Sequence, residues 1–156
     1  MTKIIRIHKT GGPEVLSWED YSLNDPAEGQ VRIRHTAIGL NMIDCYQRSG
    51  LYPIDLPAIL GSEAAGIIER VGPGVKNFSI GQRVTYSGRG AYAEERNIDA
   101  NELISLPDNI EDQTAAAMML KGMTVHMLMT KCYAIKAGEI TEVNFLSEEK
   151  NGKKSH

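Results

Sequence analysis

Residues 64–86 read AAGIIERVGPGVKNFSIGQRVTY, and this stretch holds the pattern that decides the fold. An apolar run from Ala64 to Val71 is stopped by Gly72-Pro73-Gly74, and a second turn at Ile80-Gly81-Gln82 leads into the run at 83–86. Short apolar runs that end at glycine and proline are typical of β-strands joined by tight turns. The sequence therefore predicts two strands here, separated by a loop.

The same succession of short runs and turns extends over the first hundred residues. Strand-like runs also occupy residues 3–8, 15–21, 30–38, 91–98 and 102–106. The first two flank a turn at Thr10-Gly11-Gly12-Pro13 and are predicted to form a hairpin. Strands at intervals of about 8–12 residues favour a barrel or a sandwich over repeated βαβ units. The predicted fold class is therefore mainly β with a few helices.

Two helical stretches interrupt this pattern. In residues 41–48 the apolar side chains fall at helical spacing, Asn41 can cap the start, and Ser49-Gly50 ends the run. A second helical stretch begins at Glu111, and it is expected to break at Gly122 because glycine is a weak helix former.

Composition and charge exclude several functional classes. The chain has 156 residues, 42% hydrophobic and 24% charged, and 17 Lys and Arg against 20 Asp and Glu give a formal net charge of -3. These values are typical of one globular domain. The longest basic block is Lys153-Lys154, which is too short to predict nucleic acid or an anionic membrane surface as a partner. No apolar run approaches the roughly 20 residues that span a bilayer, and Arg6 interrupts the run that a secretory signal needs. The expected location is cytoplasmic.

Side chains that bind metals are scattered singly along the sequence. A catalytic zinc needs about three Cys, His or carboxylate ligands around an open position. The candidates share no ligand-pair spacing: His8, His35, Cys45, Glu63, His126 and Cys132. No metal site is therefore predicted, and these histidines and cysteines are interpreted as structural.

One glycine-rich segment formally matches a dinucleotide-binding loop. Residues 88–93 read GRGAYA, which fits the pattern G-x-G-x-x-A, and Asp108 follows twenty residues after Gly88. Such a loop must open a helix within a βαβ unit to bind a pyrophosphate. Because the residues that follow favour a strand, the segment is interpreted as a turn before a strand.

The richest segment is GLNMIDCYQRSGLYP at residues 39–53, which contains an amide, a carboxylate, two phenols and a guanidinium. It resembles the zinc-independent, zeta-crystallin-like quinone oxidoreductases of the medium-chain dehydrogenase/reductase superfamily, in particular their bacterial members. Further matches are HKTGGPEVL at 8–16, GSEAAG at 61–66, VGPGV at 71–75 and LKGMTV at 120–125. The resemblance is nearly collinear from about Ile4 to Glu139.

This resemblance implies a GroES-like, partly open β-barrel over residues 1–138. In the similar enzymes a Rossmann domain follows, opening with an apolar strand and a glycine-rich loop, whereas residues 139–156 no longer match and are mostly polar. After a short strand-like piece at 140–146, they are expected to form a partly disordered tail. The Rossmann domain, which carries most of the cofactor site in those enzymes, is therefore expected to be absent.

The resemblance also implies the residues of a site. The positions matching Asn41, Asp44, Tyr46 and Thr124 lie close to NADPH in similar enzymes, and Tyr52 matches a tyrosine beside the substrate pocket. Asn41, Tyr46 and Tyr52 are the implied catalytic donors, since neutral N–H and O–H groups stabilise charge on a carbonyl oxygen without a metal. Zinc-dependent relatives carry a cysteine at the position of Asn41 and a histidine at that of Ser62. The alternative is that Asn41 only caps a helix and the tyrosines only pack.

The expected function is that of the N-terminal, catalytic-type domain of an NADPH-dependent quinone oxidoreductase, with negligible activity for this chain alone. One alternative is a non-catalytic GroES-like binding module, or half of a split enzyme that docks in trans with a Rossmann chain. Another is a relative that reduces enones or alkenals, and the oligomeric state also stays open. A docking face would be apolar, and five methionines lie in that region: Met118, Met119, Met123, Met127 and Met129. We interpret them as core residues, which is the commoner role of clustered methionines.

Overall fold

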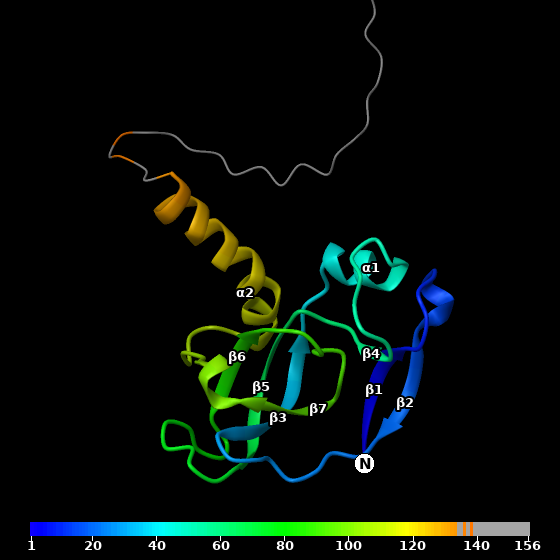
Figure 1. Cartoon of the computed structure of the whole chain (residues 1–156). Coiled ribbons are helices and arrows are strands. Elements are labelled where there is room, and N and C mark those ends of the chain that lie inside the picture. Colours follow the sequence, from blue (N-terminus) through cyan, green and yellow to red (C-terminus); the bar gives the residue numbers. More distant parts are fainter. Residues whose placement is uncertain (134–135, 137, 139–156) are drawn as a thin grey trace, which may run out of the picture. The chain divides into compact units, whose positions relative to one another are not determined.

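Eight strands and two α-helices form most of the described chain in the computed structural model, which describes residues 1–133, 136 and 138 (Figure 1). The strands are β1 (Thr2–Ile7), β2 (Ser17–Tyr21), β3 (Gln30–Ile38), β4 (Ala58–Ile59), β5 (Glu63–Val71), β6 (Arg83–Ser87), β7 (Glu95–Asp99) and β8 (Ile104–Ser105). The helices are α1 (Met42–Ser49) and α2 (Asp112–Met127), with 3-10 turns at Pro13–Val15 and Ala100–Glu102 and a π-helical turn at Leu128–Cys132. The chain divides into two compact units, Met1–Gly122 and Met123–His156, and the first carries the eight strands.

The strands form two antiparallel sheets within the first unit, seen side by side in Figure 1. Five strands run in the order β7-β3-β5-β6-β8, and three in the order β2-β1-β4. β1 and β2 form the predicted hairpin, with Ile5 opposite Trp18. β3 pairs with β5 on one side and with β7 on the other. The mainly β fold class predicted from the sequence is confirmed.

Alternation along β3 builds the core of the five-stranded sheet. Val31 and Ile33 are fully buried, and Ile68 of β5, Val84 of β6 and Ile98 of β7 pack with them. Successive side chains of a strand point to opposite faces, so every second residue reaches this core. Each buried aliphatic side chain contributes about 1.5–3 kcal/mol, and the core therefore holds the four strands that supply it together.

Residues 91–94 join the two sheets. The N–H of Ile5 donates to the carbonyl oxygen of Tyr92 at 2.8 Å, and the N–H of Glu94 donates to that of Lys3 at 2.9 Å. An isolated β-bridge lies between these two bonds. β7 begins only after this segment, so the predicted strand starts four residues later than expected.

The glycine-rich segment 88–93 is a loop between β6 and β7 and opens no helix. Gly90 has a φ of 87°, in the left-handed region that glycine adopts readily, and its N–H donates to the carbonyl oxygen of Gly61 at 2.9 Å. A pyrophosphate site of the dinucleotide-binding type needs a helix N-terminus at this point. The interpretation of this segment as a turn before a strand is therefore confirmed.

α1 follows β3 and matches its prediction to within a residue. Asn41 is the N-cap residue, and its N–H donates to the Asp44 carboxylate at 3.0 Å, which satisfies a donor at the helix start. The helix ends at Gly50, whose φ of 86° is left-handed. Figure 1 shows α1 beyond the end of β3.

α2 runs through Gly122 without interruption, so the predicted break there is wrong. A glycine costs a helix only about 1 kcal/mol relative to alanine, and the helix formers around it outweigh that cost. The first turn is held to the strands by Asp112, which accepts from Arg83 Nε at 2.9 Å and from Thr36 Oγ1 at 2.5 Å. Within residues 1–133, neither helix is long and apolar enough to cross a membrane.

Four of the five methionines near α2 are exposed. The exposed fractions are 58% for Met118, 53% for Met123, 49% for Met127 and 38% for Met129, while Met119 is half-buried. Their interpretation as core residues is therefore wrong. The predicted tail at 139–156, with its strand-like piece at 140–146, lies outside the described residues.

Candidate active site

Asn41 connects two buried carboxylates at the start of α1. Its backbone N–H donates to Asp44 Oδ2 at 3.0 Å, and its side-chain Nδ2 donates to Glu63 Oε1 at 2.8 Å. Asn41 is therefore more than a helix cap, because its side chain is bonded to β5 and not only to its own helix.

Glu63 is a fully buried carboxylate at the first residue of β5. Its Oε2 accepts from the backbone N–H of Leu120 at 2.7 Å, and its Oε1 lies 3.4 Å from Lys121 Nζ in addition to the Asn41 amide. Burying an ionised carboxylate is costly unless it is paired and hydrogen-bonded. Three donors, one of them a cation, offset that cost here.

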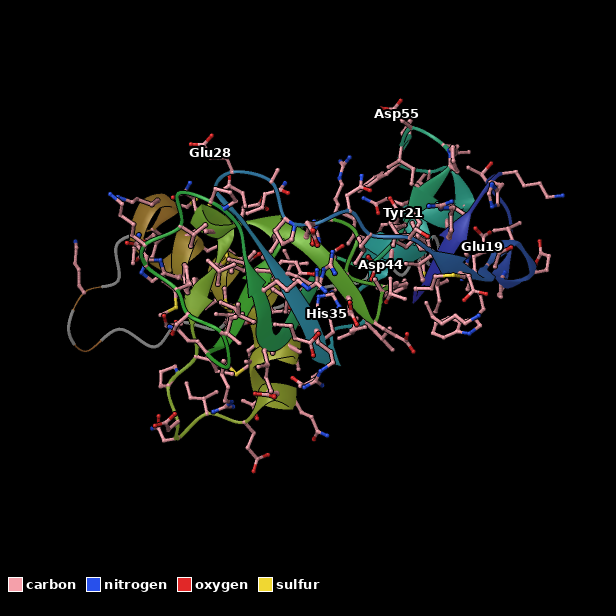
Figure 2. The ribbon with its side chains drawn as sticks, turned by 90° about the horizontal axis from the view of Figure 1, so that it is seen from below. Glu19, Tyr21, Glu28, His35, Asp44 and Asp55 are labelled. Carbon is pink, nitrogen blue, oxygen red and sulfur yellow. The ribbon has the colours of Figure 1, made fainter. Side chains whose placement is uncertain are left out.

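Asp44 is the second buried carboxylate, with 3% of the residue exposed. Ser62 Oγ donates to Oδ1 at 2.7 Å, and the Tyr92 hydroxyl donates to Oδ2 at 3.0 Å. Burial raises the pKa of Tyr92, and the neighbouring Asp44 carboxylate raises it further by charge and by hydrogen bonding. In Figure 2 the Asp44 side chain of α1 lies within the body of the molecule, whereas Asp55 points away into solvent. Asp44 thus holds Asn41, Ser62 and Tyr92 in place through hydrogen bonds, and its predicted contact with a cofactor stays a prediction.

Lys121 is the one cationic side chain that bonds to Asn41 or Glu63 in the described part of the chain. Its Nζ donates to Asn41 Oδ1 at 2.9 Å and lies 3.4 Å from the carbonyl oxygen of Ala117, while 53% of its side chain is exposed. Sequence reasoning missed Lys121 as a site residue and considered Glu63 only as a possible metal ligand. The available signal was a single charge inside each of two apolar runs, MMLKG and SEAAG.

Gly39 permits the close approach on which this network depends. A Cβ at Gly39 would lie 2.3 Å from the carbonyl oxygen of Ala116 and 2.3 Å from Glu63 Cγ. Any side chain here would push α2 away from β5, and with it the donors that Leu120 and Lys121 supply to Glu63.

Tyr46 and Tyr52 form a separate pair of rings on α1 and the loop that follows. Their centroids are 5.4 Å apart with an interplanar angle of 58°, and the N–H of Tyr52 donates to the carbonyl oxygen of Tyr46 at 3.1 Å. Half of Tyr52 is exposed. Neither hydroxyl bonds to another residue in the described part of the chain, so both are free to meet a ligand. Thr124 lies in α2 within the second unit, and its role stays a prediction.

A groove of about 560 Å³ adjoins this network but contains none of the predicted site residues. Its lining includes Trp18, His35, Ile38, Leu40 and Tyr92. Tyr92 bonds to Asp44 from one side and faces this groove from the other. The hydrogen-bonded network around Asn41, rather than the groove, is where the chemically useful groups converge.

The described residues contain no group of three or more His, Cys, Asp or Glu side chains that could hold a metal ion. Ser62, at the position where zinc-dependent relatives have a histidine, donates to Asp44. The network is thus built on hydrogen bonds and one ammonium group.

Comparison with known proteins gives this domain a family. The family model of the alcohol dehydrogenase GroES-like domain matches residues 27–108, more than half of the chain. The chain belongs to this family. The GroES-like fold expected from the sequence is therefore confirmed.

Relatives of this GroES-like domain include quinone oxidoreductases. It is 49% identical over 142 residues to "Quinone oxidoreductase 1" of Escherichia coli K12, covering 89% of this chain and 43% of the relative. It is 42% identical over 141 residues to "2-haloacrylate reductase" of a Burkholderia species, covering 85% of this chain and 42% of that protein. The solved structure of E. coli quinone oxidoreductase complexed with NADPH superimposes with a TM-score of 0.83 at 48% identity, over 86% of this chain and 42% of that one. The chain spans less than half the length of these relatives and matches their N-terminal part.

The donors of this GroES-like domain fit the nicotinamide end of a dinucleotide better than its phosphates. Asn41, Tyr46 and Tyr52 offer neutral N–H and O–H groups, which suit a carboxamide or a carbonyl oxygen. Phosphates favour a helix N-terminus with glycine or clustered cations, and segment 88–93 opens no helix.

Proposed function

We propose that this chain is the catalytic-type, N-terminal part of an NADPH-dependent quinone oxidoreductase. The observation that carries the proposal is the Asn41 amide, which is bonded to Glu63 and Lys121 and still has one Nδ2 hydrogen without a partner among the described residues. The 48% identity to a quinone oxidoreductase complexed with NADPH supports the assignment of cofactor and substrate class.

The role of the chain's own groups follows from the charge that the reaction creates. When bound, NADPH would supply a hydride to the quinone, and the carbonyl oxygen of the quinone would carry negative charge until it takes a proton. A donor that is already oriented lowers the energy of that charge without reorganising during the reaction. Asn41 presents such a donor, and the free hydroxyls of Tyr46 and Tyr52 are the two further donors that we assign to the substrate side.

The chain alone is expected to bind NADPH weakly. The donors that suit the nicotinamide end, Asn41, Tyr46 and Tyr52, are neutral, whereas phosphate contacts supply much of the affinity for a dinucleotide and segment 88–93 opens no helix that could hold a phosphate. Titration of the cofactor fluorescence should therefore give a dissociation constant no tighter than about millimolar, which corresponds to about 4 kcal/mol of binding free energy. Micromolar affinity for this chain alone would contradict the proposal that most of the cofactor site lies elsewhere.

A second candidate is the reduction of an activated carbon–carbon double bond. It is favoured by the 42% identity to a protein named 2-haloacrylate reductase. The same Asn41 donor would then stabilise charge on the carbonyl or carboxylate oxygen conjugated to the double bond. The two candidates separate when this chain is combined with the remaining part of the E. coli relative and NADPH oxidation is followed. Turnover of 1,4-benzoquinone supports the first candidate, and turnover of 2-chloroacrylate supports the second.

A further inference from the structure

Both ends of the Asn41 side-chain amide contact groups of opposite charge. Lys121 Nζ donates to Oδ1 at 2.9 Å, and Nδ2 donates to Glu63 Oε1 at 2.8 Å. We propose that Lys121 and Glu63 are positioning residues that fix the rotation of this amide, so that Asn41 presents an N–H and not its oxygen to a ligand. The proposal rests on the proposed function only in taking Asn41 as the donor that meets the substrate.

The charges make the two orientations of the amide unequal. An asparagine amide has nearly the same shape after its oxygen and nitrogen are exchanged, so only its hydrogen-bond partners decide between them. In the exchanged orientation, Oδ1 would face the Glu63 carboxylate and the N–H group would face the Lys121 ammonium. Both contacts would be repulsive, whereas both contacts in the observed orientation are charge-assisted. The Lys121 ammonium and the Glu63 carboxylate thus determine that Oδ1 faces Lys121 and Nδ2 faces Glu63.

The positions of the two charged groups are themselves constrained. Glu63 is fully buried and its second oxygen accepts from the N–H of Leu120 at 2.7 Å, so the carboxylate cannot rotate without losing a bond. Lys121 also lies 3.4 Å from the carbonyl oxygen of Ala117, one turn back on α2. The backbone of Asn41 is held separately through Asp44. With the backbone and both partners fixed, the amide keeps a single rotation.

The hydrogen count gives this arrangement its chemical meaning. The amide nitrogen carries two hydrogens, of which Glu63 takes one. The second has no partner among the described residues and is the only polar hydrogen of Asn41 left to bind an oxygen. A free amide would instead present its oxygen for part of the time, and an oxygen repels a carbonyl that is gaining negative charge.

The test measures the Asn41 side-chain amide of the full chain by NMR, without cofactor. The signals are assigned with Asn41→Ala, and the side-chain amide of Asn97, which donates to the carbonyl oxygen of Asn24 at 2.8 Å, serves as an internal reference. In Lys121→Met we expect the shifts of the two Asn41 amide protons to move together. We also expect the Nδ2 hydrogen that Glu63 holds to exchange with water faster, by up to roughly tenfold, because the amide can then rotate away from Glu63. Lys121→Arg should restore the original signals, and Lys76→Met, in a distant loop, should leave them unchanged.

Glu63→Gln provides the second arm. A neutral amide cannot accept from Asn41, Lys121 and Leu120 with the same strength, so the Asn41 signals should change in the same direction. Unchanged Asn41 signals in Lys121→Met, with the Asn97 reference intact, would overturn the proposal. If Glu63→Gln fails to fold, Lys121→Met decides, because the Lys121 side chain is half exposed. Because no NADPH is present, the result is independent of the cofactor titration that tests the proposed function.

Discussion

His35 lies on β3, where its Nδ1 contacts the carbonyl oxygen of Ala93 at 2.6 Å and its Nε2 contacts the Tyr86 hydroxyl at 3.0 Å. A carbonyl oxygen only accepts, so Nδ1 carries the hydrogen, and Nε2 of the neutral ring accepts from Tyr86. Burial lowers the pKa of His35 to about 4, the bond to Ala93 opposes this shift, and the Arg96 charge adds to it. The imidazole is therefore a neutral structural group at physiological pH.

This residue gives the free energy of unfolding a specific pH dependence. The folded-state pKa of His35 is depressed, so as pH falls from about 6.5 towards 4 the unfolded chain takes up a proton that the folded chain does not. The resulting loss of stability is at most about 3 kcal/mol. Urea unfolding of wild type and His35→Gln over this range should show a flatter pH dependence for the variant. The matched control, His126→Gln at an exposed histidine of α2, should keep the wild-type slope, and an equal flattening in both variants would contradict the assignment to His35.

The residues that sequence reasoning could not connect were Glu63 and Lys121. Asn41 and Tyr52 stand in a recognisable motif, but the bond from Asn41 to Glu63 spans 22 positions and that from Lys121 to Asn41 spans 80. No local pattern encodes a contact at that separation, because it depends on how β5 and α2 meet. A lone charge in an apolar run indicates a buried partner without naming it.

At the scale of elements, the contact between α2 and β5 depends on Gly39, because glycine has no side chain to separate them. In Gly39→Ala, the new Cβ would lie 2.3 Å from the carbonyl oxygen of Ala116 and from Glu63 Cγ, so we expect a loss of stability of about 1–3 kcal/mol. Gly122→Ala is the matched control, since nothing lies within 4 Å of its Cβ position and α2 continues through it. This control should gain up to about 1 kcal/mol from helix propensity. Thermal unfolding of both variants measures the two shifts, and a stabilised Gly39→Ala would refute the close contact.

Elements with a strong period were predicted well, and those set by tertiary contacts were not. The strand at 30–38 was predicted with the bounds that β3 has, because its alternation has one buried face. β8 covers only Ile104–Ser105 of the predicted run 102–106, since Ala100–Glu102 forms a 3-10 turn that no apolar pattern reveals. Gly122 shows the opposite error, because a weak local signal was outweighed by the helix on both sides.

At the scale of the whole molecule, the first unit exposes a set of apolar side chains beside the candidate site. The exposed fractions are 76% for Leu40, 64% for Met42 and 58% for Met118. Leu40 and Met42 flank Asn41, whose side chain bonds to Lys121, three residues after Met118, so the segments that carry these side chains meet at the site. Clustered apolar side chains on a surface indicate an interaction site.

Self-association is the directly measurable consequence of this exposed face. In analytical ultracentrifugation we expect the weight-average mass to rise with concentration, because contact between two such faces removes apolar surface from water. Leu40→Ser with Met118→Ser should reduce the rise. Ile80→Ser is the control, since the exposed fraction of Ile80, 68%, is similar. Ile80 lies between β5 and β6, next to Gly81, whose N–H donates to the carbonyl oxygen of Ile68, five residues along β5 from Glu63. A strict monomer at the highest concentration would count against an interaction role for this face. An equal effect of Ile80→Ser would show that general surface hydrophobicity, and not this face, drives association.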